Sequence, residues 1–206
     1  MAERTDSTIV NALVRQALTS AQEVMGENGL NAVLRASGLE RFIGNFPPND
    51  LEPSIQASQY AKLNQAIEDF YGRGGRGMLR RIGKASFQYG VREQAALLGI
   101  AGVALKLLPE KQKIKFILNG MANALKKSNP QVEASVDDSG ERIAYMESTC
   151  AICQGRHSET PLCHLYAGSI AEAVQWATGK EFEITETHCC AKGDPYCRFE
   201  VGAARE

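Results

Sequence analysis

The hydrophobic period of this chain changes at Pro130, and the change separates two kinds of secondary structure. Before Pro130, apolar residues recur at spacings of three and four, which is typical of helices that bury one face. After Pro130, apolar and polar residues alternate, which indicates half-buried strands. The sequence therefore predicts an α+β fold in a single domain of residues 1–206, with a helical part at residues 1–129 and a sheet part at residues 130–202.

The helical part is expected to contain amphipathic helices at residues 7–26, 30–37, 54–71, 78–94 and 110–128. A glycine, Gly26 or Gly29, can end the first helix in a left-handed conformation. The apolar run at residues 95–108 is expected to continue the 78–94 helix into the core. At about 14 residues it is shorter than the roughly 18 to 20 that cross a bilayer, so no transmembrane segment is expected.

The sheet part reads as two hairpins on either side of a helix. Residues 132–136 and 143–147 alternate around an Asp-Asp-Ser-Gly turn, and residues 182–186 and 196–201 alternate around a second turn. Between them, Thr160 and Pro161 are expected to cap and open a helix. The order β-β-α-β-β predicts one four-stranded antiparallel sheet with helices packed on one side.

Charge and composition limit the partners and the cellular compartment that we expect for this protein. The formal net charge of −1 gives no overall field that would attract nucleic acid or an acidic membrane. The first seven residues carry charges of both signs and lack the apolar centre of a signal peptide, so we expect a cytoplasmic protein. Six cysteines in a reducing compartment are not expected to form three structural disulfides.

All cysteines and histidines of the chain follow Thr149, and they predict a metal site. Thiolates, imidazoles and carboxylates bind zinc tetrahedrally, and the spacing Glu186-x2-Cys189-x7-Cys197 lets a strand end and a turn bring three ligands together. Cys163, near a helix N-terminus that favours a thiolate, is the fourth expected ligand. Four protein ligands leave no open position, so the zinc would be structural.

Other interpretations of the cysteines stay open. They could be buried and inert, or they could have a redox role. The spacing Cys150-x2-Cys153-x3-His157 is also typical of a metal site. A thioredoxin-like motif would lie between a strand and a helix, whereas a loop is expected here. Cys190 should point away from Cys189, so we do not expect both thiols to bind one ion.

The pattern Cys163-x22-Glu186-x2-Cys189-x4-Asp194-x2-Cys197-x-Phe199 resembles the 4-vinyl reductase, or hydrocarbon-binding, domain family. That family shares its fold with TRAPP vesicle-tethering subunits. It includes the sensory domains of phenol-responsive transcription activators and a protein implicated in bacteriochlorophyll synthesis. The resemblance is specific over residues 150–201. It implies a TRAPP-subunit-like fold, zinc on the four ligands named above, and an apolar pocket between helices and sheet.

The resemblance implies that this pocket takes a small hydrophobic or aromatic molecule, with a tetrapyrrole among the candidates. The alternative for each candidate lining residue is an ordinary place in the core. The candidates are Phe87, Leu97, Leu98, Ile100, Val103, Phe116, Ile117, Met121 and Tyr145.

A second motif, Gly72-Arg-Gly-Gly-Arg-Gly77, lies between two predicted helices. A phosphate-binding glycine loop follows a strand, so a glycine-rich corner between helices is favoured over nucleotide binding. If the ligand is a tetrapyrrole, Arg73, Arg76 or Arg80 would pair with its propionates.

The sequence thus favours a domain that binds a small hydrophobic molecule as a sensor, carrier or assembly factor, and we expect a homodimer. One alternative is an enzyme, or enzyme subunit, that reduces a vinyl group of a chlorophyll precursor. The chain shows no dinucleotide fingerprint and no iron–sulfur spacing, so it offers no evident electron source for that reaction. A third interpretation is a protein-interaction module.

Overall fold

The computed structural model describes residues 6–94 and 105–205. The helices are α1 (Asn11–Ala36), α2 (Ala57–Tyr71), α3 (Gly75–Gln94), α4 (Glu110–Ser128) and α5 (His164–Thr178). The strands are β1 (Thr8–Val10), β2 (Pro53–Gln56), β3 (Ala134–Asp137), β4 (Ala144–Glu147), β5 (Phe182–His188) and β6 (Cys197–Ala204). Short 3-10 turns occupy Glu40–Phe42, Gly72–Gly74, Leu105–Leu107 and Cys190–Lys192.

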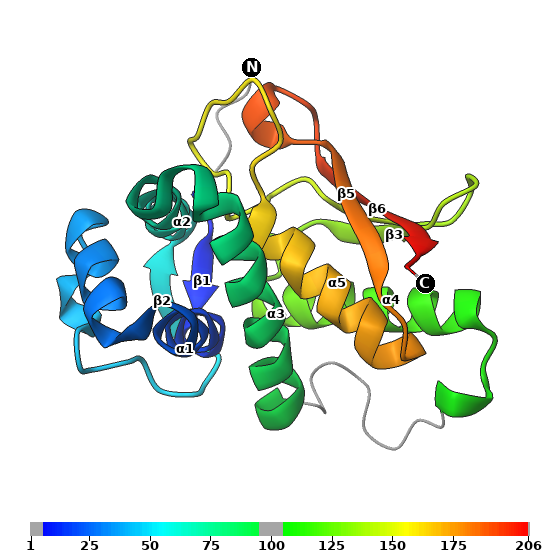
Figure 1. Cartoon of the computed structure of the whole chain (residues 1–206), viewed down its shortest axis with the longest axis horizontal. Coiled ribbons are helices and arrows are strands. Elements are labelled where there is room, and N and C mark those ends of the chain that lie inside the picture. The colour runs from blue at the N-terminus through cyan, green and yellow to red at the C-terminus, as the bar shows by residue number, and fades with distance from the viewer. Residues whose placement is uncertain (1–5, 95–104, 206) are drawn as a thin grey trace.

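The sheet part confirms the predicted α+β architecture. Strands β3, β4, β6 and β5 form a four-stranded antiparallel sheet in that spatial order. Helix α5 connects β4 to β5, and α4 and α5 lie on the same face of the sheet (Figure 1). Tyr145 on β4 pairs with Phe199 on β6, and both side chains are fully buried beneath those helices.

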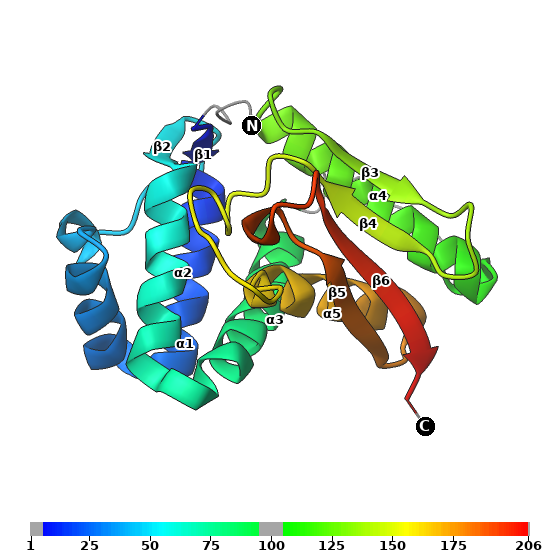
Figure 2. The same cartoon turned by 90° about the horizontal axis from the view of Figure 1, so that it is seen from above.

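Helices α3 and α5 lie side by side in both views (Figures 1 and 2) and meet backbone to backbone. A Cβ atom on Gly83 would lie 2.0 Å from the carbonyl oxygen of Leu165, and one on Gly168 would lie 2.1 Å from that of Arg80. The hydroxyl of Ser169 donates to the carbonyl oxygen of Gly83 at 3.0 Å. Only glycine fits at the two crossing positions, because any side chain would push the helices apart.

The expectation that everything before Pro130 is helical is wrong at two places. Strands β1 and β2 form a small antiparallel pair in which Ile9 faces Ile55, and both side chains are buried. The backbone N–H of Ala57 donates to the carbonyl oxygen of Ser7 at 2.7 Å. The helices predicted from residues 7 and 54 therefore begin at 11 and 57, since the β-branched residues of Thr8–Val10 favour a strand where a partner strand is present.

Helix α1 contains the predicted break at Gly26, where φ is 75° and ψ is 165°. Phe70 is 54% exposed near the end of α2, which stops one residue later at the turn Gly72–Gly74. Within the predicted helical run at residues 95–108, residues 95–104 lie outside the described part of the chain, and Leu105–Leu107 forms a 3-10 turn. No helix in the described part is both long and apolar enough to cross a membrane.

Candidate metal centre and ligand pocket

Five cysteine thiols meet where the loop after β4, the start of α5 and the β5–β6 hairpin come together. All five side chains are nearly or fully buried. Cys163 Sγ lies 3.5 Å from Cys150 Sγ, 3.8 Å from Cys197 Sγ and 3.9 Å from Cys189 Sγ. The Sγ atoms of Cys153 and Cys197 are 3.5 Å apart. Four thiolates bound at about 2.3 Å around a tetrahedral ion would be about 3.8 Å apart, so this spacing suits a metal ion.

Two overlapping sets of four residues place their ligand atoms within 4.8 Å of one another. The first set is the one predicted from the sequence: Cys163, Glu186, Cys189 and Cys197. The second set replaces Glu186 and Cys189 with Cys150 and Cys153. Cys163 and Cys197 belong to both sets, so these two thiols form the centre of the cluster.

Cys163 does not lie inside the helix as predicted. It is the residue immediately before α5, which begins at His164 instead of near Pro161. Its backbone N–H donates to Glu186 Oε2 at 2.8 Å, so a side chain from β5 caps the start of α5 where Thr160 was expected to do so. The capping residue therefore comes from a distant strand.

Glu186 has one carboxylate oxygen that no described group satisfies. Oε2 accepts the Cys163 N–H, whereas Oε1 is buried without a hydrogen-bond partner among the described residues. Burial, followed by the charge of Cys189, raises the pKa of Glu186 to about 8. A cation beside Oε1 would offset the cost of burying this oxygen without a partner, so the carboxylate fits a metal-ligand role.

The turn between β5 and β6 holds two of the thiols in place. Cys189 N–H donates to Asp194 Oδ2 at 2.8 Å, and Cys190 N–H donates to Cys197 Sγ at 3.3 Å. Hydrogen bonds from the thiols of Cys153, Cys163 and Cys197 lower the pKa of Cys189. Cys190 is in neither ligand set, and its own thiol donates to the Ser148 carbonyl oxygen at 3.8 Å.

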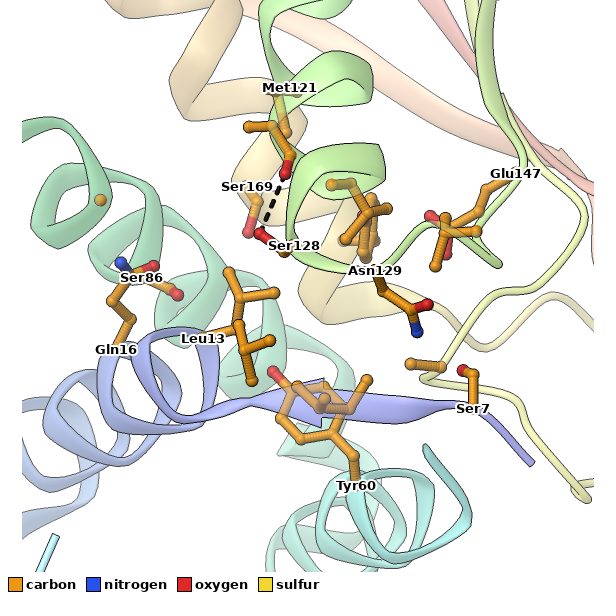
Figure 3. Close-up of a pocket in the computed structure, with 18 of the residues that line it drawn as sticks. Ser7, Leu13, Gln16, Tyr60, Ser86, Met121, Ser128, Asn129, Glu147 and Ser169 are labelled. Atoms are coloured by element: carbon orange, nitrogen blue, oxygen red, sulfur yellow. Dashed lines mark hydrogen bonds between the residues drawn. The ribbon is translucent and has the colours of Figure 1, made fainter. Parts of the chain in front are cut away.

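A cavity of about 150 Å³ lies beside the cluster, among α1, α3, α4, α5 and β1 (Figure 3). A cavity of roughly this volume with apolar walls holds a benzene molecule. Its apolar wall comes mostly from the helices, and a polar part comes from the end of β4 and the loop that follows. The lining includes Val10, Leu13, Gln16, Tyr60, Phe87, Met121, Ala124, Leu125, Glu147, Thr149, Ala151, Leu165 and Tyr166.

Two of the sequence-predicted pocket residues, Phe87 and Met121, line this cavity. Tyr145 is not in the lining, but its hydroxyl lies 3.4 Å from that of Tyr166, which does line the cavity. Phe116 and Ile117 are not in the lining. The remaining four predicted residues, Leu97, Leu98, Ile100 and Val103, lie outside the described part of the chain.

The three arginines proposed as anion contacts are exposed at the start of α3 and its preceding turn, and none lines the cavity. Arg80 donates through Nη2 to the carbonyl oxygen of Ile184 at 3.3 Å, so its head group joins α3 to β5. The three arginines therefore lie outside the pocket in which the tetrapyrrole of that hypothesis would bind.

Two polar residues of the cavity, Gln16 and Glu147, were missed from the sequence. Gln16 is 6% exposed and Glu147 is 2% exposed. The alternation of Ile143, Tyr145 and Glu147 was the available signal, because it places Glu147 on the same strand face as the buried Tyr145. A carboxylate at a core-facing strand position is rare enough to mark a site.

A comparison with family models finds a match over the segment that holds the cysteine cluster and all four predicted ligands. Residues 147–203 match the V4R domain. This match confirms the resemblance to the 4-vinyl reductase domain over the segment that holds the cysteine cluster. It starts at Glu147, so it also includes part of the cavity wall.

Two relatives support the V4R match over short segments. The bacteriochlorophyll synthase 23 kDa chain of Cereibacter sphaeroides is 35% identical over 63 residues, which cover 31% of this chain and 31% of that protein. An uncharacterized protein of Methanocaldococcus jannaschii is 31% identical over 86 residues, or 41% of this chain and 50% of that protein. The chain thus spans no more than half the length of either relative.

The likeness in fold extends over nearly the whole chain. An oxygen-binding H-NOX domain related to soluble guanylate cyclases matches 94% of this chain and 93% of its own, with a TM-score of 0.62 and 12% sequence identity. A second H-NOX structure, described as giving insight into H-NOX activation, matches 96% and 99% with a TM-score of 0.60. At this identity the comparison shows a shared fold.

Proposed function

We propose that this chain is a small-molecule-binding domain whose ligand is mainly hydrophobic, with a structural zinc ion beside the binding cavity. The observation that carries the proposal is the largely apolar pocket between the helices and β4. An apolar cavity with a few polar groups is the usual form of a small-molecule site. The V4R match and the H-NOX-like fold support it.

The zinc ligands that we propose are Cys163, Glu186, Cys189 and Cys197. Their ligand atoms are close enough to bind one ion, and the unsatisfied Oε1 of Glu186 favours this set over the four-cysteine set. Zinc bound there would cross-link the β5–β6 hairpin to the start of α5. Since all four positions would be taken by protein groups, the ion would stabilise the fold and leave no site for water or substrate.

Metal analysis of single-cysteine variants tests the ligand set. Wild-type protein should contain about one zinc per chain. Cys189→Ser should lose zinc and unfold at a lower temperature, whereas Cys150→Ser should keep zinc. The matched control is Cys190→Ser, since this thiol belongs to neither set. Retention of zinc by Cys189→Ser together with its loss from Cys150→Ser would show instead that the four-cysteine set binds the ion.

Native mass spectrometry of protein purified from its own host tests the ligand-binding proposal. We expect a mass increment from a bound molecule that disappears after mild denaturation. Ala124→Phe, which adds a large side chain to the cavity wall, should abolish the increment while leaving zinc in place. A mass increment that survives in Ala124→Phe would place the bound molecule elsewhere.

A role in tetrapyrrole chemistry is the second candidate, and the similarity to the bacteriochlorophyll synthase chain favours it. A cavity of about 150 Å³ accepts one ring, so a four-ring pigment would need the described walls to move apart. Reductant-dependent conversion of a vinyl tetrapyrrole by the isolated chain would establish this role and displace the binding-domain proposal.

We also propose that the chain forms a homodimer. Large apolar side chains remain exposed on the described surface, among them Phe70 at 54% and Trp176 at 43%. Light scattering after size exclusion should give twice the chain mass of 22.4 kDa. A mass equal to that of one chain at high micromolar concentration would contradict the dimer.

A further inference from the structure

The cavity contains a carboxylate oxygen that is buried without a partner. Glu147 is 2% exposed and lines the cavity, and its Oε2 has no hydrogen-bond donor among the described residues. Figure 3 shows the carboxylate of Glu147 directed toward the space between α4 and β1. Leaving such an oxygen unsatisfied is costly, so the bound ligand is the natural source of its donor.

The described lining offers Glu147 no positive charge. It contains no lysine, arginine or histidine, and its other polar groups are hydroxyls and amides. The hydroxyls of Tyr166 and Tyr145 interact with this carboxylate, but both are neutral and leave its charge uncompensated. An anionic ligand would meet an acidic group in a poorly solvated space, whereas a cationic ligand would supply the missing charge.

A second polar group in the cavity wall also lacks a partner. Gln16 on α1 is 6% exposed, and its Nε2 has no acceptor among the described residues. Figure 3 places Gln16 and Glu147 on opposite sides of the lining, with Leu13 and Met121 between them. The cavity therefore has an apolar middle and two unsatisfied polar groups, one a hydrogen-bond acceptor and the other a donor.

From this arrangement we infer that the cavity binds a compact, mainly apolar amine whose ammonium group donates to the carboxylate of Glu147. The inference rests on the proposed ligand-binding function and adds the chemical class of the ligand. The volume of about 150 Å³ restricts the apolar part to roughly one ring. The amide of Gln16 is then free to donate to an acceptor at the other end of the ligand.

Calorimetric titration with three probes of similar size tests the inference: benzylamine, toluene and benzoate. Benzylamine should bind at least about tenfold more tightly than toluene, because a hydrogen bond to a charged group contributes about 1.5 to 3 kcal/mol. Benzoate should bind more weakly than toluene. Glu147→Gln should abolish the preference for benzylamine and leave toluene binding within about twofold.

Glu183→Gln is the matched control, because it makes the same change at an exposed position on β5 outside the cavity. It should retain the full preference for benzylamine. Toluene binding as tightly as benzylamine would overturn the amine inference and leave the proposed hydrophobic-ligand function standing. If none of the probes binds to zinc-loaded protein, both the inference and that function fail. A preference that persists in Glu147→Gln would show that another group recognises the amine.

Discussion

The backbone N–H of Cys163 donates to Oε2 of Glu186 across 2.8 Å, and this bond joins the start of α5 directly to β5. The two residues are 23 positions apart. The same carboxylate has its other oxygen, Oε1, buried beside the cysteine cluster without a partner. One side chain therefore caps a helix and keeps its second oxygen available to a metal ion.

Replacing Glu186 with Gln should separate these two roles. The amide oxygen still accepts the Cys163 N–H, but the anionic ligand is lost. We predict that zinc affinity falls at least about tenfold in competition with a colorimetric chelator. The unfolding temperature without metal should stay equal or rise, because a buried carboxylate has been removed. Unchanged zinc affinity would favour the four-cysteine set.

Substitution of Gly168 by Ala should destabilise the protein strongly. The added Cβ would lie 2.1 Å from the carbonyl oxygen of Arg80, so α3 and α5 would have to separate. We predict a loss of more than about 3 kcal/mol in the free energy of unfolding, measured by denaturant titration. Gly77→Ala on α3, where nothing lies within 4 Å of the added atom, is the control and should stabilise by about 0.5 to 1 kcal/mol. Equal effects of the two substitutions would contradict the close crossing.

The stability of the ligand-free protein should depend on pH through Glu147. Burial raises its pKa from the ordinary 4.5 to about 7, so the folded state disfavours the ionised form. The contribution of Glu147 is fully present below pH 4.5 and is lost as the pH rises through 7. The loss amounts to about 3 kcal/mol at most. Thermal unfolding of wild type and Glu147→Gln should therefore diverge between pH 5 and 8, with the variant more stable at the higher pH. Parallel curves would mean that Glu147 is solvated.

Gln16→Met should raise stability and alter ligand preference. Methionine is close in size and removes a buried amide nitrogen that lacks an acceptor, which costs about 1 to 3 kcal/mol. We predict a higher unfolding temperature for the empty protein and unchanged affinity for toluene. The affinity for ligands with an acceptor opposite their amine should fall. Lower stability of Gln16→Met would show that the amide is satisfied in solution.

Much of the fold follows from local pattern. Glu110–Ser128 is helical with the predicted bounds, and α5 ends at Thr178, before Gly179 in the left-handed conformation. These elements are defined by residues close together in the chain. The strands β1 and β2 were not predicted, because three or four residues become a strand only when a distant partner pairs with them.

The same distinction applies to the site. The spacing of Cys163, Glu186, Cys189 and Cys197 predicted a group whose ligand atoms the structure brings within 4.8 Å of one another. The approach of Cys150 and Cys153 to that group depends on the path of a loop, which spacing does not determine. The cavity lining is harder still to predict from the sequence, since β1, α1 and α4 each contribute only a few residues. Glu147 is the exception, because strand alternation alone places its carboxylate toward the core.

The close crossing of α3 and α5 at Gly83 and Gly168 gives the cavity one wall that cannot adapt. Ser86 and Phe87 on α3, and Leu165 and Ser169 on α5, line the cavity from helices whose backbones already touch. Ligands of different width must then be accommodated by α1 and α4. Among relatives with this architecture, differences in ligand size should therefore coincide with sequence differences at positions such as Leu13 and Met121. These two positions are the first choice for redesigning ligand selectivity.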